Sequence, residues 1–290
     1  MTVLRRFEIH QPASALEVSQ MLAHYGDEAG VYAGGTELLL AMKHEALSYR
    51  HLIDVKVIPG IGSIDLRDGV LEIGATSTHR NIERSALVRE RQPVLAELES
   101  QVANVRVRGT GTLGGNLCFA EPHSDPATLL LVLGGAVKLE GSAGAREIAV
   151  GEFIAGAYAN SLLPGEILTR IVVPCAKPNH RAAYLKFQVH ERPTLGLALW
   201  LETPDDGRTF TAARVAVGCA CPSPTRTPGA EELLTGPRSS VEKRLPDAAA
   251  AIGDAADLAD DHEGSVEYKR NLIRVLLRRA FRKALGEEMQ

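Results

Sequence analysis

The chain has 290 residues, 45% of them hydrophobic, which is enough apolar material for two or three modest cores. Its formal net charge of -4 provides no overall basic field and argues against nucleic-acid binding through phosphate neutralisation. The N-terminus lacks the apolar core of a signal peptide, and the longest apolar run, around residues 127–137, is interrupted by Gly134-Gly135 and is shorter than the ~20 residues that span a bilayer. We therefore expect a cytoplasmic protein without a membrane span.

The residue types that most often carry catalysis or bind metals show no recognisable arrangement. Four dispersed cysteines form neither a disulfide framework nor a C-x2-C pair, and Cys219-x-Cys221 is best interpreted as two small buried residues. The nine histidines are scattered, and no Ser-His-Asp order, HExxH helix or P-loop is present. We predict neither a catalytic residue nor a metal ligand in this chain.

The first segment, residues 1–54, predicts strand, helix, strand and helix, which make a small βαβ-like lobe. Ser14 can cap a helix over residues 15–25, with Glu17 at the capping-box position. Residues 30–33 form a short β-prone run before Gly34-Gly35, and residues 37–43 are expected to be helical. The two glycines thus fall where a strand gives way to a helix.

The second segment, residues 55–175, predicts a mixed or antiparallel sheet with helices. Asp125 is placed to cap one of these helices, and Pro93 is acceptable in the first turn of another. The expected strands are residues 71–73, 136–140 and 167–173, and the expected helices are residues 81–88, 93–102 and 127–133.

The third segment, residues 176–290, predicts a small antiparallel sheet from three β-prone stretches, residues 183–189, 195–201 and 214–220. Residues 237–264 are weakly patterned and are either helix or mobile loop. Apolar residues at helical spacing predict a long final helix over residues 265–285, whose basic stripe is either a solvated face or a partner contact. The fold class is therefore α+β.

The glycine pair in Ala33-Gly34-Gly35-Thr36 suits an anion. Adjacent glycines permit positive φ and expose consecutive backbone amides, which form a nest for negative charge. The Thr36 hydroxyl and the N-terminus of the following helix would add to this attraction. Because Gly-Gly before a helix is also an ordinary tight turn, this motif alone decides nothing.

A second glycine motif, Gly109-x-Gly111-x-x-Gly114, matches the dinucleotide-binding fingerprint. A Rossmann turn opens directly into a helix, whereas residues 116–122 are expected to be extended and to stop at Pro122. We therefore interpret it as a second anion-cradling loop, with Thr112 and Asn116 able to reach phosphate or ribose oxygens.

Three stretches together carry a family resemblance: Tyr32-Ala33-Gly34-Gly35-Thr36-Glu37-Leu38, Thr112-Leu113-Gly114-Gly115-Asn116-Leu117 and Pro122-His123-Ser124-Asp125. They resemble the FAD-binding medium subunit of the molybdenum hydroxylases, which include xanthine dehydrogenase and carbon monoxide dehydrogenase. The resemblance covers essentially the whole chain. It implies a two-subdomain FAD-binding region, made of a βαβ lobe and a mixed or antiparallel sheet lobe, followed by a C-terminal antiparallel sheet with helices.

The resemblance also implies a set of cofactor-binding residues. The two glycine motifs would enclose the FAD diphosphate, and Lys186 would lie near the isoalloxazine and stabilise its reduced form, unless it is only a solvated strand residue. After this lysine the chain reads Gln188-Val189-His190-Glu191-Arg192-Pro193-Thr194, where many relatives carry an Arg and, two or three residues later, an Asp. The implied cofactor-binding residues are Tyr32, Ala33, Gly34, Gly35, Thr36, Glu37, Leu38, Val102, Ala103, Gly111, Thr112, Gly114, Gly115, Asn116, Ser124, Asp125, Leu168 and Lys186.

By the same resemblance, a large partner subunit holds the molybdenum cofactor, a small partner holds [2Fe-2S] clusters, and FAD in this chain passes electrons to an external acceptor. The assembly implied is a dimer of heterotrimers. Two alternatives remain open: a self-contained flavin oxidoreductase, and an FAD-binding assembly or storage protein. Neither the hydroxylated substrate nor the electron acceptor follows from the sequence.

Overall fold

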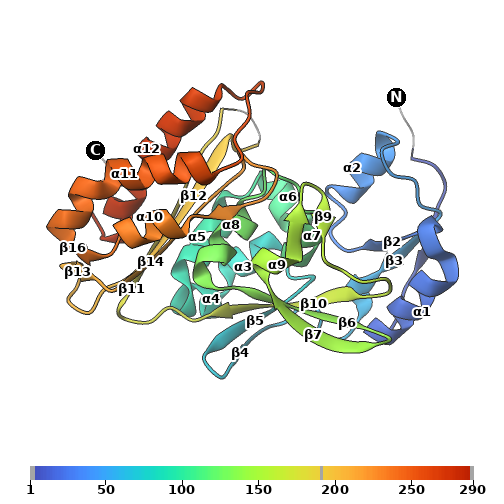
Figure 1. The fold of residues 1–290 in the computed structure, drawn as a ribbon. Helices are drawn as coiled ribbons and strands as arrows, with labels where there is room; N and C mark the ends of the chain where they lie inside the picture. The colour runs from blue at the N-terminus through green and yellow to red at the C-terminus, as the bar shows by residue number, and fades with distance from the viewer. Residues whose placement is uncertain (1–3, 190–191, 288–290) are drawn as a thin grey trace. The chain divides into compact units, whose positions relative to one another are not determined.

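The computed structural model describes residues 4–189 and 192–287, and its chain forms two compact units (Figure 1). The first unit comprises the chain up to Ala120 together with Gly135–Cys175, and the second comprises Glu121–Gly134 and the chain from Ala176 onward. Of the divergent stretch at residues 188–194, His190 and Glu191 lie outside the described residues.

The N-terminal lobe of the first unit is a parallel sheet in the order β1-β3-β2. The predicted helix over residues 15–25 is confirmed, and Ser14 Oγ accepts a hydrogen bond from the Glu17 amide at 3.2 Å. Because the strands are parallel, β2 and β3 both end at the edge from which the first glycine turn departs. The elements are β1 (Glu8–His10), α1 (Ala15–Tyr25), β2 (Ala29–Tyr32), α2 (Leu38–Lys43), β3 (His51–Asp54) and the 3-10 turns Gly26–Glu28 and Val55–Val57.

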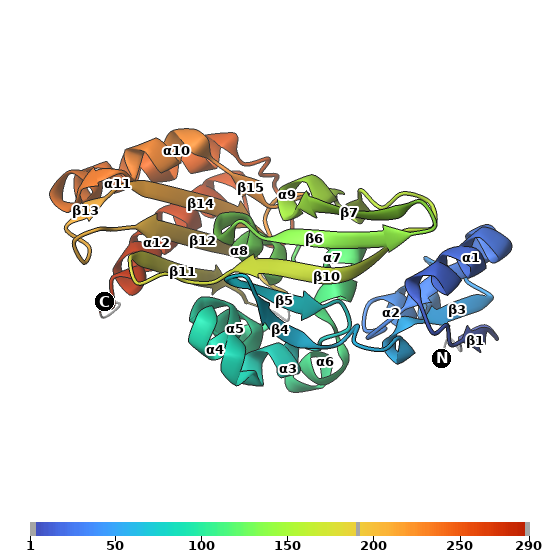
Figure 2. The ribbon, with the colours of Figure 1, turned by 90° about the horizontal axis from the view of Figure 1, so that it is seen from below.

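The rest of the first unit is built on an antiparallel sheet in the order β4-β5-β10-β6-β7, with helices α3–α6 beside its β4–β5 side (Figure 2). The strands are β4 (Ile64–Arg67), β5 (Val70–Gly74), β6 (Ala136–Gly141), β7 (Gly144–Ala149) and β10 (Ile167–Pro174), with a small hairpin of β8 (Ile154–Gly156) and β9 (Ala159–Asn160). The helices are α3 (His79–Arg84), α4 (Ala86–Arg91), α5 (Pro93–Gln101), α6 (Val105–Thr110), α7 (Leu113–Phe119) and α9 (Val150–Phe153).

Two sequence-based predictions in this unit are wrong. The single helix expected over residues 81–88 is divided at Ser85, which follows α3 and caps α4 by accepting a hydrogen bond from the Val88 amide. Residues 116–122, expected to be extended, begin inside α7, which ends at Phe119 before Ala120 turns left-handed with φ 50°. The second glycine motif therefore does open into a helix, although helix α6 rather than a strand precedes it.

The second unit contains the predicted antiparallel sheet, in the order β11-β12-β14-β15. Residues 237–264, predicted as helix or loop, are mostly helical, because α11 runs to Ala255 through Pro246. The sheet elements are β11 (His180–Phe187), β12 (Leu195–Glu202), β14 (Ala212–Gly218) and β15 (Thr225–Arg226), and β13 (Thr209–Phe210) pairs with β16 (Gly236–Pro237). The helices are α8 (Asp125–Leu133), α10 (Pro228–Leu233), α11 (Arg238–Ala255) and α12 (Val266–Ala284).

Opposite faces of this sheet meet different helices, because neighbouring side chains of a strand point in opposite directions. Leu185 and Phe187 of β11 pack against the apolar cluster that includes Ile273 and Leu277 of α12. Tyr184 and Lys186, which alternate with these two residues along β11, contact Asp125 at the start of α8. No helix within the described ranges is both long enough and apolar enough to cross a membrane.

Candidate functional site

The first glycine turn, residues 33–36, connects the carboxyl end of β2 to α2. Gly35 has φ +73°, and a Cβ there would lie 2.4 Å from the ring of Tyr32, so the turn requires glycine at this position. Within the residues that the structure describes, the amides of Gly34, Gly35 and Thr36 donate no hydrogen bond. Crevices beyond the carboxyl ends of parallel strands are where α/β sheets bind ligands, so these amides are well placed for an anion.

Lys56 supports this turn from the 3-10 turn Val55–Val57 that follows β3, and sequence reasoning missed it. Its Nζ donates to the Ala33 carbonyl at 3.0 Å and to Asp54 Oδ1 at 2.6 Å, and it lies 3.8 Å from the centre of the Tyr32 ring. The lysine therefore fixes the turn and brings a positive charge to it. No local pattern around Lys56 in the sequence indicates this contact, because it depends on the pairing of β2 with β3.

The second glycine turn lies directly against the first. A Cβ on Gly34 would come within 2.4 Å of the Thr110 carbonyl oxygen and 2.8 Å of the Gly111 Cα. A Cβ on Gly111 would lie 3.4 Å from Thr36 Oγ1. The structure thus brings together the two motifs that the sequence pairs, and the absence of a side chain at Gly34 is what permits the contact.

The second turn differs from the first because the amides of Leu113, Gly114 and Gly115 already donate hydrogen bonds within the protein. Leu113 donates to the Ser77 carbonyl at 3.1 Å and Gly114 to the Ala75 carbonyl at 3.0 Å. The Gly115 amide donates to Thr112 Oγ1, also at 3.1 Å. The expectation that this turn cradles an anion with its own amides is therefore not met at these positions, and Thr112 serves as the helix cap of α7.

A third segment, residues 75–79, holds the second turn in place. Gly114 packs so closely on it that a Cβ would lie 2.6 Å from the Ala75 carbonyl oxygen. The Ala75 amide in turn donates to the carbonyl of Thr169, the residue at which the pairing of β10 with β6 shifts register. A β-bulge in the central strand thus fixes the segment that carries the second turn.

Of the other cofactor positions inferred for the first unit, Val102 and Leu168 are buried and Ala103 is exposed. Val102 is buried directly after α5, and Ala103 follows with φ 41° before Asn104 caps α6. Leu168 is buried on β10, one residue before the bulge at Thr169.

Ser124, Asp125 and Lys186 belong to the second unit. Ser124 precedes α8 as its cap residue, and Asp125 begins the helix as an almost fully buried carboxylate. Lys186 Nζ donates to Asp125 Oδ2 at 2.7 Å, and the side chains are only 9% and 5% exposed. Lys186 is therefore a buried partner of Asp125 and not a solvated strand residue.

Two further groups complete the surroundings of Asp125. The Tyr184 hydroxyl donates to Asp125 Oδ1 at 2.5 Å, and Cys219 Sγ lies 3.9 Å from the same oxygen. Burial and the neighbouring carboxylate raise the pKa of both Tyr184 and Cys219 well above their usual values, so both remain protonated. Cys219 follows β14 in a left-handed conformation, whereas Cys221 belongs to the apolar cluster beside α12, so the two thiols do not form a pair.

Two family models match consecutive parts of the chain. Residues 5–176 match the FAD binding domain in molybdopterin dehydrogenase, and residues 184–284 match the CO dehydrogenase flavoprotein C-terminal domain. The chain belongs to the molybdopterin dehydrogenase FAD-binding family. It is thus an oxidoreductase flavoprotein component, and the family assignment made from the glycine motifs is confirmed.

Relatives of this family match over nearly the full length of the chain. The carbon monoxide dehydrogenase medium chain of Afipia carboxidovorans is 31% identical over 96% of each chain. The xanthine dehydrogenase FAD-binding subunit of Escherichia coli O157:H7 is 25% identical, over 96% of this chain and 95% of the relative. The solved structure of carbon monoxide dehydrogenase from Hydrogenophaga pseudoflava, in a form that lacks the Mo-pyranopterin moiety, aligns with a TM-score of 0.91 at 29% identity over 98% of this chain and 99% of that one.

Proposed function

We propose that this chain is the FAD-binding medium subunit of a multi-subunit molybdenum hydroxylase and transfers electrons from iron–sulfur clusters to an external acceptor. Similarity to medium chains and FAD subunits along the whole chain supports the subunit role. The observation that carries the cofactor site is the contact between the two glycine turns, where the first turn presents three amides that donate no hydrogen bond within the described residues.

The residues at the first turn fit the diphosphate of FAD. The amides of Gly34, Gly35 and Thr36 would donate to its phosphate oxygens, and Lys56, whose charge is shared with Asp54, would offset part of its negative charge. The second turn would close the site by shape, because Gly34 has no side chain to keep Thr110 and Gly111 away from the first turn. When bound, FAD supplies the redox centre that this chain's own side chains lack.

The other cofactor contacts remain predictions. On the second turn, Thr112 and Asn116 are the side chains assigned to phosphate or ribose oxygens. That Val102, Ala103, Leu168, Ser124, Asp125 and Lys186 bind the cofactor stays a prediction from the family resemblance. The ion pair with Asp125 weakens the positive charge that Lys186 could offer to a reduced flavin.

The partners follow from the family. A large subunit holds the molybdenum cofactor and a small subunit holds the iron–sulfur clusters, and the medium chains of such complexes match this chain from end to end. We further propose a dimer of heterotrimers and a cytoplasmic location, for which sedimentation of the assembled complex and cell fractionation are the respective tests.

Purification of the tagged chain from its native source tests the function. We expect two co-purifying subunits, molybdenum and iron in the complex, and FAD bound to this chain. The isolated chain should bind FAD and show no substrate-dependent reduction of it. Substrate oxidation by the isolated chain would instead support a self-contained flavin enzyme, and FAD binding without any co-purifying redox subunit would support an assembly or storage protein.

A further inference from the structure

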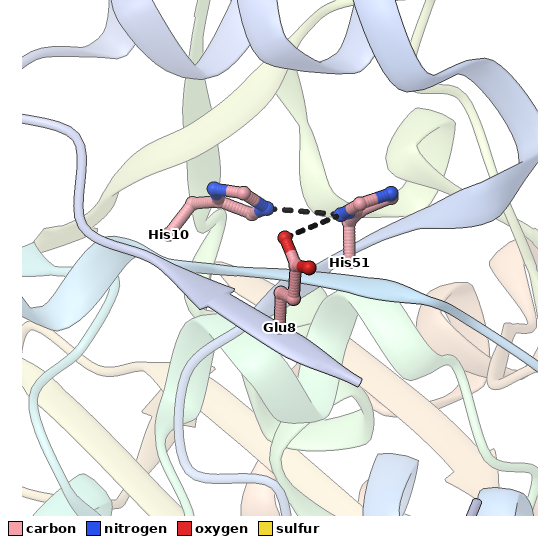
Figure 3. A group of neighbouring side chains, drawn as sticks. All are labelled: Glu8, His10 and His51. Atoms are coloured by element: carbon pink, nitrogen blue, oxygen red, sulfur yellow. Dashed lines mark hydrogen bonds and ion pairs between the residues drawn. The ribbon is translucent and has the colours of Figure 1, made fainter. Parts of the chain in front are cut away.

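Two histidines and a glutamate meet on one face of the N-terminal parallel sheet (Figure 3). Strand β1 pairs with β3 in a register that places Glu8 opposite His51, and His10 lies two residues further along β1. Side chains two residues apart in a strand share a face, so all three point to the same side of the sheet. Each offers one nitrogen or oxygen atom, and these atoms all lie within 4.8 Å of one another.

The spacing of these atoms suits a tetrahedral cation. His10 Nε2 lies 3.0 Å from His51 Nδ1, and the same nitrogen of His51 lies 3.8 Å from Glu8 Oε2. Bonds of about 2.0 Å to zinc place neighbouring ligand atoms of a tetrahedron ~3.3 Å apart, which falls between the two distances. We propose that Glu8, His10 and His51 form a Zn²⁺ site whose fourth position is open to water.

A hydrogen bond between the two histidines accounts for only part of this arrangement. Nδ1 of His51 carries either one hydrogen or one lone pair, so it can pair with His10 or with Glu8, but not with both. At 3.8 Å the carboxylate is too far away to share a hydrogen bond with that nitrogen. A divalent cation between the three groups would bind both ring nitrogens and the carboxylate at once.

Tyr25, the last residue of α1, holds both rings in position. Its ring stacks on His51 at 4.0 Å with an interplanar angle of 21°, and on His10 at 4.9 Å with an angle of 27°. Packing that fixes the ligand rings before the metal arrives lowers the entropic cost of binding. Glu8 is 76% exposed and can adjust its carboxylate to complete the site.

The donor set decides which cation is bound. Two imidazoles with one carboxylate are a ligand set that zinc uses with an open fourth position, whereas Ca²⁺ and Mg²⁺ prefer oxygen ligands alone. Bound zinc would link β1 to the first residue of β3, His51. The last residue of β3, Asp54, pairs with Lys56, the lysine that contacts the first glycine turn. The site therefore stabilises the N-terminal strand of the lobe that contains the glycine turn.

Zinc titration of the full-length, FAD-loaded chain, after treatment with a chelator, tests the proposal by calorimetry. We expect one Zn²⁺ per chain and, with Co²⁺ in its place, the visible absorption of a tetrahedral site without thiolate charge-transfer bands. Loss of a ligand in His10→Gln or in Glu8→Gln should weaken binding at least about tenfold, since even outer-shell changes at zinc sites cost that much. Glu8 is exposed, so Glu8→Gln tests the site even where His10→Gln disturbs folding.

His24→Gln is the matched control, because this exposed histidine also contacts Tyr25 but lies outside the ligand group. It should bind zinc as the parent does. The proposal is overturned if zinc does not bind, if the His10 and Glu8 variants bind as tightly as the His24 variant, or if cobalt shows thiolate bands that indicate binding at cysteine.

Discussion

Replacement of Gly34 by alanine tests whether the contact between the two glycine turns shapes the FAD site. The added Cβ would lie 2.4 Å from the Thr110 carbonyl oxygen and 2.8 Å from the Gly111 Cα. Favourable contacts of carbon begin near ~3.5 Å, so the methyl group would be about 1 Å too close. Both obstructing atoms are backbone, so no rotamer change relieves the clash, and the cost should reach the upper end of the ~1–3 kcal/mol typical of overpacking.

This strain must appear either in folding or in cofactor binding. If the turns stay together, the free energy of unfolding should fall by about 3 kcal/mol. If they separate, the amides of Gly34 and Gly35 move, and the Kd for FAD should rise by up to roughly 100-fold, because each 1.4 kcal/mol changes affinity tenfold.

Both quantities can be measured on the full-length chain, by urea denaturation and by titration of flavin fluorescence. Gly109→Ala is the matched control, because a Cβ there meets nothing within 4 Å and the residue lies exposed in α6. Alanine in a helix is favoured over glycine by roughly 0.5–1 kcal/mol, so the control should be slightly more stable than the parent. The reasoning is refuted if Gly34→Ala matches Gly109→Ala in both stability and FAD affinity.

Three further predictions concern charged groups. Lys56→Met should weaken FAD binding roughly three- to tenfold, since it removes a positive charge and a hydrogen bond at the first turn, and unchanged affinity in the same titration would contradict this. Lys186→Met should lower the free energy of unfolding by ~3–5 kcal/mol in urea denaturation, because it leaves the Asp125 charge buried without its ion-pair partner. Adding Asp125→Asn to this variant should recover most of the loss. The hydrogen bond to Glu121 raises the pKa of His123 in the folded state. Protonated His123 therefore stabilises the fold fully below the unfolded-state pKa of about 6.5, and this stabilisation is lost as pH rises through the higher folded-state pKa. The free energy of unfolding should therefore fall as pH rises above about 6.5, and His123→Gln should flatten that part of the profile.

Local signals in the sequence were enough for the elements whose patterns are strong. Helix α1 begins directly after Ser14, as predicted, because a cap acts within one turn of the chain, and it ends at Tyr25 as expected. Three of the four strands of the C-terminal sheet follow from β-prone stretches, and the long helix α12 follows from apolar periodicity. The division into residues 1–54, 55–175 and 176–290 remains a prediction.

Helix α7 could not be predicted because tertiary contacts override its local composition. Two glycines and an asparagine give its first turns a poor helix propensity. The helix forms because Thr112 caps it and because the Leu113 and Gly114 amides donate to carbonyls of residues 75–77, more than thirty positions earlier. Those acceptors are in place only once the sheet has formed.

Two groups of residues were missed because strand pairing brings them together. Lys56 reaches the first glycine turn only because β2 and β3 are neighbours. His10 and His51 lie 41 positions apart and meet through the pairing of β1 with β3, which is why the histidines look scattered along the sequence. Neither pairing has a signal in the local pattern.

The two glycine motifs are therefore unequal, although the sequence presents them as a pair. At the first turn, glycine leaves amides available and Lys56 adds charge, so this turn has the chemistry to bind a diphosphate. At the second turn, the amides are tied to segment 75–79 and to Thr112, so glycine there serves close packing. Binding and support are thus divided between the turns, and the β-bulge at Thr169 matters to the site because it anchors the supporting turn through Ala75.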